Sequence, residues 1–255
     1  FGGMKRIFSL LATVVALHPL VSTGHESAVE MAEAAKVWLA SLTDGQKSQA
    51  VYGMKDAERE NWHFVPRPFE GEGMRKGVTI KEMRPDQRHL AYALLSTGLS
   101  HRGFATALEI MSLEQVLWEL ENQSPRRDTE RYYLTIFGEP GAKAWGWRFE
   151  GHHLAMNFTV VDGKVVSGTP NFFASNPGEV RQGPRAGLRV LAGEEDVARS
   201  LVQSLDEAQR GKAVAASEAP EDILTAAEKT VGPLGGEGIS FADLEPGQQK
   251  NLREL

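Results

Sequence analysis

The chain has 255 residues, 41% of them hydrophobic, with a net charge of −6 and no cysteine. This length fits one large domain or two small ones, and the composition is that of a folded chain rather than a disordered one. The negative charge excludes a broad electrostatic surface for nucleic acid. The absence of cysteine excludes disulfides, thiol catalysis and cysteine-based zinc sites.

The first predicted element is a signal peptide at residues 1–24. A basic pair follows Met4, residues 7–17 form a short apolar core, and Pro19 ends it. This order is typical of secretory targeting, and the core is too short for a permanent membrane anchor. The alternative is a buried N-terminal helix, and the FGG before Met4 is treated as an upstream addition. We therefore expect a secreted or periplasmic protein.

An internal repeat organises the rest of the chain. SLTDGQKSQAV at 41–51 resembles SLDEAQRGKAV at 204–214, and GVTIKEMRPDQ at 77–87 resembles GISFADLEPGQ at 238–248. The two pairs come in the same order and at nearly the same separation, which indicates a duplicated unit. We expect a first unit at residues 25–190 and a partial second unit at 191–255.

Each matched segment has the pattern of a helix start. Asp44 and Asp206 suit a cap or a first turn, where a carboxylate favours the helix dipole. Pro85 and Pro246 suit the first helical position, where no N–H is needed. A further helix is expected at 101–121, from its apolar spacing.

Strand patterns fill residues 131–173. They are RYYLTIF, AWGWRFE, HLAMNFTVV and KVVSGTPNFF, and Asp162-Gly163 is a typical two-residue hairpin turn. The fold class expected is therefore α+β, with two related helix-rich units and an antiparallel sheet at about 131–173. We expect the second unit to be incomplete, because no counterpart of this strand region follows it in the given sequence.

Regular strand alternation predicts a polar cluster on one face near the strand junction, formed by Arg148, Glu150, His153 and Asn157. A regular strand would put His152 on the other, apolar face, unless Gly151 is a bulge that resets the alternation. Glutamate and imidazole are metal ligands, and they also form a general acid–base pair. The alternative is a histidine that satisfies backbone groups, beside an exposed Arg148–Glu150 pair of little energetic value.

A second histidine lies in NWHFVPRPFEG, residues 61–71. Alternation places His63 opposite Trp62 and Phe64, and Arg67 stands between two prolines. His63 contributes to a site only if it lies near His153, and otherwise occupies an exposed strand position.

Other classes of site have little support in the sequence. There is no phosphate-binding glycine loop, no Gly-x-Ser-x-Gly elbow and no helical His-x-x-x-His zinc pattern. Trp145 and Trp147 share one strand face, from which they would stack on a sugar ring if exposed. Tryptophans in this setting more often pack in a core.

The segments WHFVPR, RYYLTIFGEPG, WGWRFEGHHLAMNFTVVDGKVV and SLDEAQRGKAV closely resemble domain-of-unknown-function family 3500, a family of exported bacterial and fungal proteins. The resemblance runs from about Trp38 onward, and the motif around WRFEGHHL is specific. It brings no established reaction, cofactor or catalytic residue. Members continue into a strand region with another histidine pair, which implies a completed second unit.

We expect an exported enzyme with a histidine–carboxylate site, either a hydrolase or an oxidoreductase, with or without a divalent transition metal. The candidate catalytic residues are Glu150, His153, Arg148 and Arg67. The candidate metal ligands are His63, His152, His153 and Glu150. The arginines would hold an anionic substrate group or a developing charge. The alternatives are a non-catalytic sugar- or peptide-binding protein and a truncated product without function.

Overall fold

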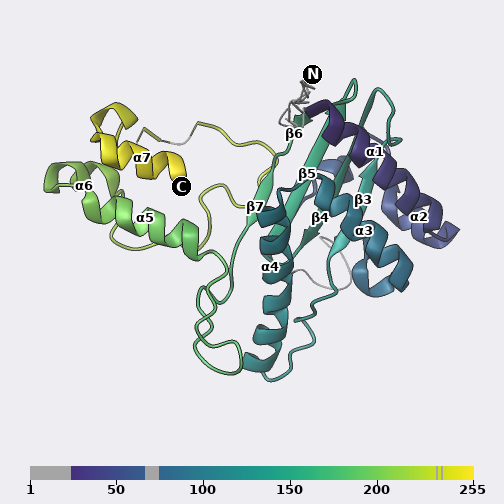
Figure 1. Ribbon diagram of the computed structural model, residues 1–255, viewed down its shortest axis with the longest axis horizontal. Helices are drawn as coiled ribbons and strands as arrows, with labels where there is room; N and C mark the ends of the chain where they lie inside the picture. The colour runs from purple at the N-terminus through teal and green to yellow at the C-terminus, as the bar shows by residue number, and fades with distance from the viewer. Residues whose placement is uncertain (1–23, 67–74, 234, 237) are drawn as a thin grey trace, which may run out of the picture.

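The computed structural model describes residues 24–66, 75–233, 235–236 and 238–255. Its centre is a seven-stranded mixed sheet covered by helices, and a separate group of short helices carries the C-terminus (Figure 1). The mixed helix-and-sheet architecture confirms the coarse fold expected from the sequence. The predicted signal peptide lies outside the described residues, apart from Gly24.

Six of the helical segments that the structure describes precede strand β3 (Tyr133–Phe137), and two short strands lie among them. The helical segments are α1 (Gly24–Ser41), α2 (Asp44–Ala50), η1 (Ala57–Glu60), η2 (Ile80–Glu82), α3 (Pro85–Thr97) and α4 (His101–Leu120). Pro85 takes the first position of α3, as predicted. Thr43 caps α2 and Asp44 lies in its first turn, which is one of the two arrangements expected for that carboxylate.

The strands are β1 (Val51–Tyr52), β2 (Val78–Thr79), β3 (Tyr133–Phe137), β4 (Ala144–Gly151), β5 (Leu154–Val161), β6 (Lys164–Ser167) and β7 (Asn171–Phe173). Their order is β1-β3-β4-β5-β6, with β2 also paired to β3 and β7 to β5. The strands of residues 131–173 pair antiparallel, as expected, but the whole sheet is mixed because β1 runs parallel to β3. That strand comes from residues 51–52, far outside the predicted strand region.

The final predicted strand, KVVSGTPNFF, is two strands rather than one. β6 pairs with residues 159–161 of β5, whereas β7 pairs with residues 154–156 of the same strand. Residues 168–170 separate them, and Pro170 has no N–H for a ladder. The predicted hairpin at Asp162-Gly163 is confirmed, since both residues have the positive φ that this turn requires.

One face of the sheet forms the main core. Trp145, Trp147 and Phe149 of β4 pair with Val160, Phe158 and Met156 of β5, so all six side chains share this face. Helices α1, α3 and α4 pack on it, as Figure 1 shows, and residues such as Trp38 and Leu94 are fully buried there. The strand alternation predicted this face correctly, because every second side chain of a strand points the same way.

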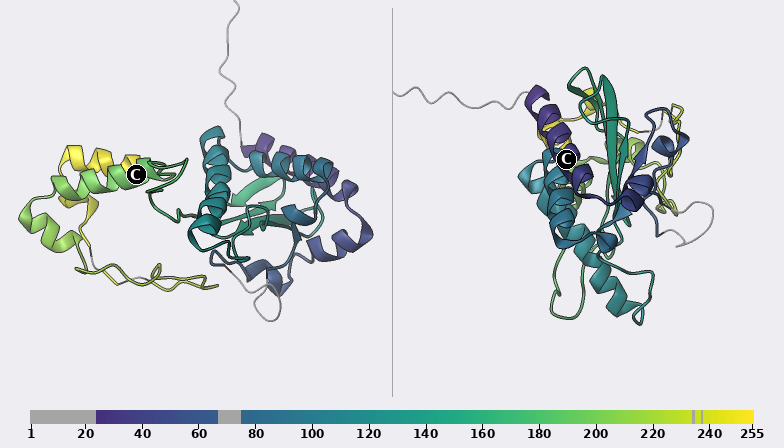
Figure 2. Two further views of the ribbon diagram at one scale, coloured as in Figure 1. Left: turned by 90° about the horizontal axis from the view of Figure 1, so that it is seen from below. Right: turned by 90° about the vertical axis from the view of Figure 1, so that its right-hand side faces the viewer.

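The C-terminal helices form a group of their own. They are α5 (Ala192–Ser204), α6 (Glu207–Ala213), η3 (Phe241–Asp243) and α7 (Pro246–Glu254). Figures 1 and 2 show this group to one side of the sheet, joined to it by long connections. Pro246 takes the first helical position of α7, and Asp206 caps α6, as expected.

A reciprocal pair of glutamine amides ties helices together in each half of the chain. Gln46 and Gln87 exchange amide hydrogen bonds of 3.1 and 2.9 Å, and Gln87 also donates to the Ser41 carbonyl at 2.8 Å. Gln209 and Gln248 exchange bonds of 3.0 and 2.9 Å. Gln248 donates to the carbonyl oxygen of residue 204, also at 2.8 Å.

Candidate functional site

Charged side chains cover the polar face of β4. Arg148 and Glu150 are both fully buried, and Arg148 Nε lies 2.9 Å from Glu150 Oε1, although its N–H is not aligned with that oxygen. Arg148 also donates to the Glu58 carbonyl at 2.8 Å and contacts the Glu58 carboxylate. Arg75 reaches Glu150 from the other side at 3.9 Å. The predicted Arg148–Glu150 pair therefore exists, but it is buried rather than exposed.

Glu150 is held on all sides by protein groups. Its Oε2 accepts a 2.8 Å hydrogen bond from the backbone N–H of His63. Burial raises the pKa of Glu150, while Arg148 and Arg75 oppose that rise. With no exposed surface on either Arg148 or Glu150, neither side chain meets a substrate in this conformation. The pair links β4 to the segment that contains His63.

The two adjacent histidines are not strand residues. Gly151 pairs with Leu154, so His152 and His153 form the two-residue turn between β4 and β5. His153 has a φ of 57°, and its backbone N–H donates to the Phe64 carbonyl at 2.7 Å. The expectation that His153 shares a strand face with Arg148 and Glu150 was wrong, because a tight turn ends the alternation of the strand.

His152 points toward helix α4. Its Nδ1 contacts the carboxylate of Glu114, and Arg127 Nη1 lies 3.2 Å from the same nitrogen. Nδ1 cannot both donate to Glu114 and accept from Arg127, and the contact with the carboxylate favours the tautomer that has its proton on Nδ1. The carbonyl oxygen of His152 accepts a 2.9 Å hydrogen bond from the Tyr132 hydroxyl. These contacts hold the imidazole and its backbone in place.

Further contacts hold Arg127 in place. It donates two hydrogen bonds, of 2.7 and 2.9 Å, to the Glu121 carboxylate, and lies 3.8 Å from Glu114. A paired guanidinium that is held by two parallel bonds has a fixed direction. His152, Glu114, Arg127 and Glu121 thus form a continuous chain of contacts from the hairpin to the end of α4.

His153 is in a less polar setting. Its ring lies 4.0 Å from that of His152, between centroids, and its Nδ1 is buried without a hydrogen-bond partner. Burial, together with the nearby His152 and Arg127, lowers the pKa of His153 to about 4. His153 is therefore neutral near pH 7, and it packs at the turn instead of acting beside Glu150.

The remaining candidates lie elsewhere. His63 Nε2 is 2.8 Å from Asn61 Oδ1, a local contact within its own segment. Arg67 lies outside the described residues. Asn157 sits opposite Arg148 in the sheet, as predicted, but its amide donates to the Pro170 carbonyl at 2.8 Å.

A metal site would require several of these side chains to converge. Within the described ranges, no group of three His, Asp or Glu side chains lies close enough to hold one ion. The expected ligands His63, His152, His153 and Glu150 do not form such a set, because Glu150 faces Arg148 while His152 faces Glu114. Trp145 and Trp147 are in the core, so they do not form an exposed aromatic platform.

Two cavities share Glu114 in their linings, and His152 lines the smaller one. A small cavity of about 20 Å³ is lined by His152 and Glu114 among others, and a groove of about 380 Å³ is also lined by Glu114. Both share Asp128 and Arg131, and the groove adds Arg127. The smaller one has room for a single water molecule, since about 10–15 Å³ is sufficient for one.

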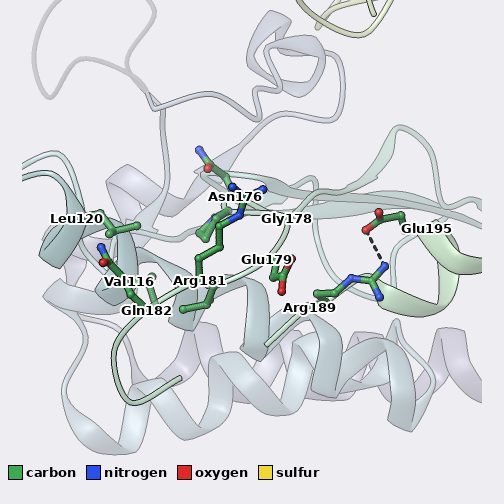
Figure 3. A pocket seen from close by; sticks show the side chains of 11 residues that line it. Val116, Leu120, Asn176, Gly178, Glu179, Arg181, Gln182, Arg189 and Glu195 are labelled. Atoms are coloured by element: carbon green, nitrogen blue, oxygen red, sulfur yellow. Dashed lines mark ion pairs between the residues drawn. The ribbon is translucent and has the colours of Figure 1, made fainter. Parts of the chain in front are cut away.

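A larger cavity lies away from the histidines. It has a volume of about 630 Å³ and is formed between the end of α4, residues 176–182 and the start of α5 (Figure 3). Arg189 on its wall is paired with Glu195 at 2.8 Å, as the dashed line in Figure 3 shows. None of the predicted site residues that the structure describes lines this cavity.

Sequence reasoning missed Glu114, Arg127, Arg75 and Glu58. One signal was present for Glu114, which lies on the buried stripe of α4 with Ala107, Ile110, Met111 and Leu117. A carboxylate within an apolar helical stripe needs a buried partner, so its position predicts a special contact. The other three residues lie in segments without a regular pattern, and only the tertiary fold brings them to the hairpin.

The chain matches a family described as "Protein of unknown function (DUF3500)" over residues 24–255. The chain belongs to this family. The DUF3500 match covers both the hairpin that bears the histidines and the C-terminal helices. No curated protein and no solved structure matches the chain. Within the part that the structure describes, no helix is long and apolar enough to cross a bilayer.

Proposed function

We propose that this protein is an exported enzyme that hydrolyses an anionic substrate, with His152 as the general base. The observation that carries the proposal is the contact between His152 Nδ1 and the buried Glu114 carboxylate, since both residues line a small cavity and Glu114 also lines the neighbouring groove. A histidine whose one nitrogen is held by a carboxylate presents its other nitrogen in a defined tautomer.

The chemistry follows from that tautomer. With the proton on Nδ1, the Nε2 lone pair of His152 accepts a proton from a water molecule as that water attacks the substrate. Glu114 then stabilises the imidazolium that forms, and the proton passes to the leaving group when the substrate bond breaks. Positioned acid–base groups of this kind contribute about 10²–10⁴-fold to a reaction rate.

The groove that Glu114 lines, next to the His152–Glu114 contact, favours a negatively charged substrate. Its lining includes Lys81, Arg127 and Arg131, against the carboxylates of Glu114 and Asp128. Arginine pairs well with carboxylate and phosphate groups because its planar fork matches two oxygens. A substrate with such a group beside the bond to be cleaved fits this arrangement.

The test is hydrolysis of chromogenic nitrophenyl esters, phosphates and sulfates by the purified protein and by two variants, His152→Gln and Glu114→Gln. Both variants are expected to lose at least about 10²-fold in kcat/KM while remaining folded. His89→Gln serves as the matched control, because His89 is exposed on α3. Equal activity in all four proteins would remove His152 from the reaction.

A ligand-binding protein is the competing function, for a sugar, a peptide or another small molecule. It predicts no turnover of any of these compounds, together with measurable binding that Arg127→Gln weakens. Binding without turnover would therefore replace the enzyme proposal.

The exported location rests on the order of basic, apolar and small residues at 1–24. Expression of the whole chain in a bacterial host tests it, by N-terminal sequencing of the protein found outside the cytoplasm. A processed N-terminus near residue 25 is expected, and retention of the uncut chain in the cytoplasm would contradict it.

The duplication is also a proposal. It is supported by the matched sequences and by the equivalent glutamine pairs, Gln46 with Gln87 and Gln209 with Gln248. In each half, the first glutamine also closes a capping box, with Thr43 or Asp206 as the N-cap. Recurrence of the same contact set in the same order is difficult to reach by chance.

A further inference from the structure

A cavity of about 550 Å³ lies against the polar face of the sheet. Phe137 of β3 is opposite Gly146 of β4, and Gly146 is opposite Thr159 of β5, so these three positions share one face. Asn157 is two residues from Thr159 on the same strand and therefore shares it too. Because Gly146 has no side chain, this face is open between Phe137 and Thr159. All but Gly146 line the cavity.

Residues 223–231, the strap, form the outer wall of this cavity. The connection that leaves α6 returns to the sheet, as Figures 1 and 2 show, and six residues of the strap line the cavity. Ala227 packs against the buried cluster that contains Trp62 and Phe64. Within the described part of the chain, the backbone-to-backbone hydrogen bonds of the strap stay inside it. The strap therefore covers the cavity without being tied into the sheet.

Polar groups on the cavity wall have unused hydrogen-bonding capacity. Trp62 is only 8% exposed, yet its indole N–H has no hydrogen-bond partner among the described residues. In the same part of the chain, the hydroxyl of half-buried Thr159 has none either, and Asn157 uses only its N–H, toward the Pro170 carbonyl. Polar groups that are largely buried normally have a partner, so these groups indicate a molecule that supplies one.

The charges of the cavity wall are balanced. Its cations are Arg59 and Lys229, and its carboxylates are Glu60 and Glu228. Arg59 also lies 3.8 Å from Glu60, so that pair is already neutralised within the protein. A wall with two charges of each sign has no net charge to attract an ion. The cavity therefore favours a ligand that is polar but uncharged.

Aromatic side chains complete the lining, which includes Trp62, Phe137 and Phe172. A sugar ring presents C–H groups on its faces, which suit aromatic surfaces, and hydroxyls at its edge that both donate and accept. A peptide would instead need free backbone groups at a strand edge. Strands β3 and β5 have neighbours on both sides, so the wall offers a peptide few such groups.

We propose that this cavity binds a neutral saccharide between the polar face of the sheet and the strap. Trp62 donates to a sugar hydroxyl, Asn157 accepts from another, and Thr159 does either. The volume lies within the range of about 300–1,000 Å³ that is usual for small-molecule sites. The cavity shares no lining residue with the two cavities at Glu114, so the inference does not rest on the proposed hydrolysis.

An array of neutral oligosaccharides tests the proposal with the labelled whole chain. The array contains hexose, pentose and N-acetylhexosamine units, with neutral tripeptides beside them. Binding to at least one class of saccharide is expected, and isothermal titration calorimetry with that compound then gives its Kd. A chain that binds no saccharide would overturn the proposal, and binding to the tripeptides alone would replace it with a peptide site.

Two variants locate the bound saccharide. Thr159→Val removes the hydroxyl at nearly constant shape, and Trp62→Phe removes the N–H while keeping an aromatic ring. Each is expected to raise the Kd about three- to tenfold, because one neutral hydrogen bond is lost. Thr230→Val is the matched control, since Thr230 is exposed in the strap but does not line the cavity. The same Kd in all four proteins would overturn the proposal.

Amide hydrogen exchange of the wild type keeps the result decisive if a variant disturbs the fold. The bound saccharide is expected to slow exchange in the strap while leaving α7 unchanged. Binding without any change in the strap would place the saccharide elsewhere and overturn the proposal. The His152→Gln and Glu114→Gln variants are expected to keep the wild-type Kd for the saccharide. Failure of the hydrolysis proposal and failure of this one are thus distinguishable.

Discussion

His152 and Glu114 are in contact although they are 38 residues apart in the chain. His152 belongs to a hairpin turn, and Glu114 belongs to the buried stripe of helix α4. Two elements that are separate in the sequence therefore position the two side chains. The expected partner, Glu150, is only two residues from His152 but is turned to the opposite side of the sheet, toward Arg148. Proximity in sequence therefore pointed to the wrong carboxylate.

The contact predicts a defined tautomer for His152. In the wild type, long-range ¹H–¹⁵N correlation spectra are expected to show the proton on Nδ1. Glu114→Leu removes the acceptor, so the Nε2-protonated form is expected to gain population. Glu119→Leu is the control, because Glu119 is exposed on the same helix. An unchanged His152 signal in Glu114→Leu would show that the carboxylate does not set the tautomer.

The buried Arg148 predicts a large loss of stability on truncation. Arg148→Met leaves the carboxylates of Glu58 and Glu150 without their shared cation, and an uncompensated buried charge costs about 3–5 kcal/mol. Urea unfolding measures the change in the free energy of unfolding. A double variant, Arg148→Met with Glu150→Leu, is expected to be less destabilised than Arg148→Met alone. A double variant that is simply additive would show that the pair is not coupled.

The lowered pKa of His153 predicts that the protein loses stability at acidic pH. Its folded pKa is about 4, below the ordinary value of 6.5, so the unfolded chain binds a proton first as the pH falls. Protonation of the unfolded chain at His153 therefore lowers the free energy of unfolding between about pH 6.5 and about pH 4. His153 causes no further change above or below that range. His153→Asn, which tolerates the positive φ, is expected to flatten this part of the profile. Urea unfolding at several pH values measures it, with His89→Asn as the control that keeps the slope.

Position 151 in the hairpin has room for glycine but not for a larger residue. A Cβ at this position would overlap the ring of Tyr132, whose hydroxyl holds the His152 carbonyl. Gly151→Ala is therefore expected to cost about 1–3 kcal/mol and to shift the His152 signals. Thermal unfolding and the same NMR spectra check this. Gly53→Ala has open space around its Cβ and is expected to change neither.

The two glutamine pairs predict parallel effects of different size. Gln87→Ala removes a fully buried amide with three partners and is expected to cost about 1–3 kcal/mol. Gln248→Ala removes the equivalent contacts in the C-terminal helices. It is expected to raise amide hydrogen exchange in α5 and α7 while leaving α3 unchanged. Loss of protection throughout the chain would contradict two separate units.

The sequence by itself determined the local structure. The alternation in AWGWRFE and HLAMNFTVV predicted which side chains of β4 and β5 form the core, and Asp162-Gly163 predicted the turn after them. These features depend on a period of two or on the φ angles of two residues, and both are properties of a short segment.

Only the tertiary structure decided the site. Gly151 and the two histidines end one strand and begin another. The core positions change from odd to even numbers across them, but a bulge at Gly151 would produce the same change, so the alternation did not identify the turn. The partners of that turn come from residues 64 and 75, from α4 and from the segment between α4 and β3. Their convergence depends on how α4 packs across the sheet, because side-chain contacts between distant segments are fixed by packing rather than by local preference.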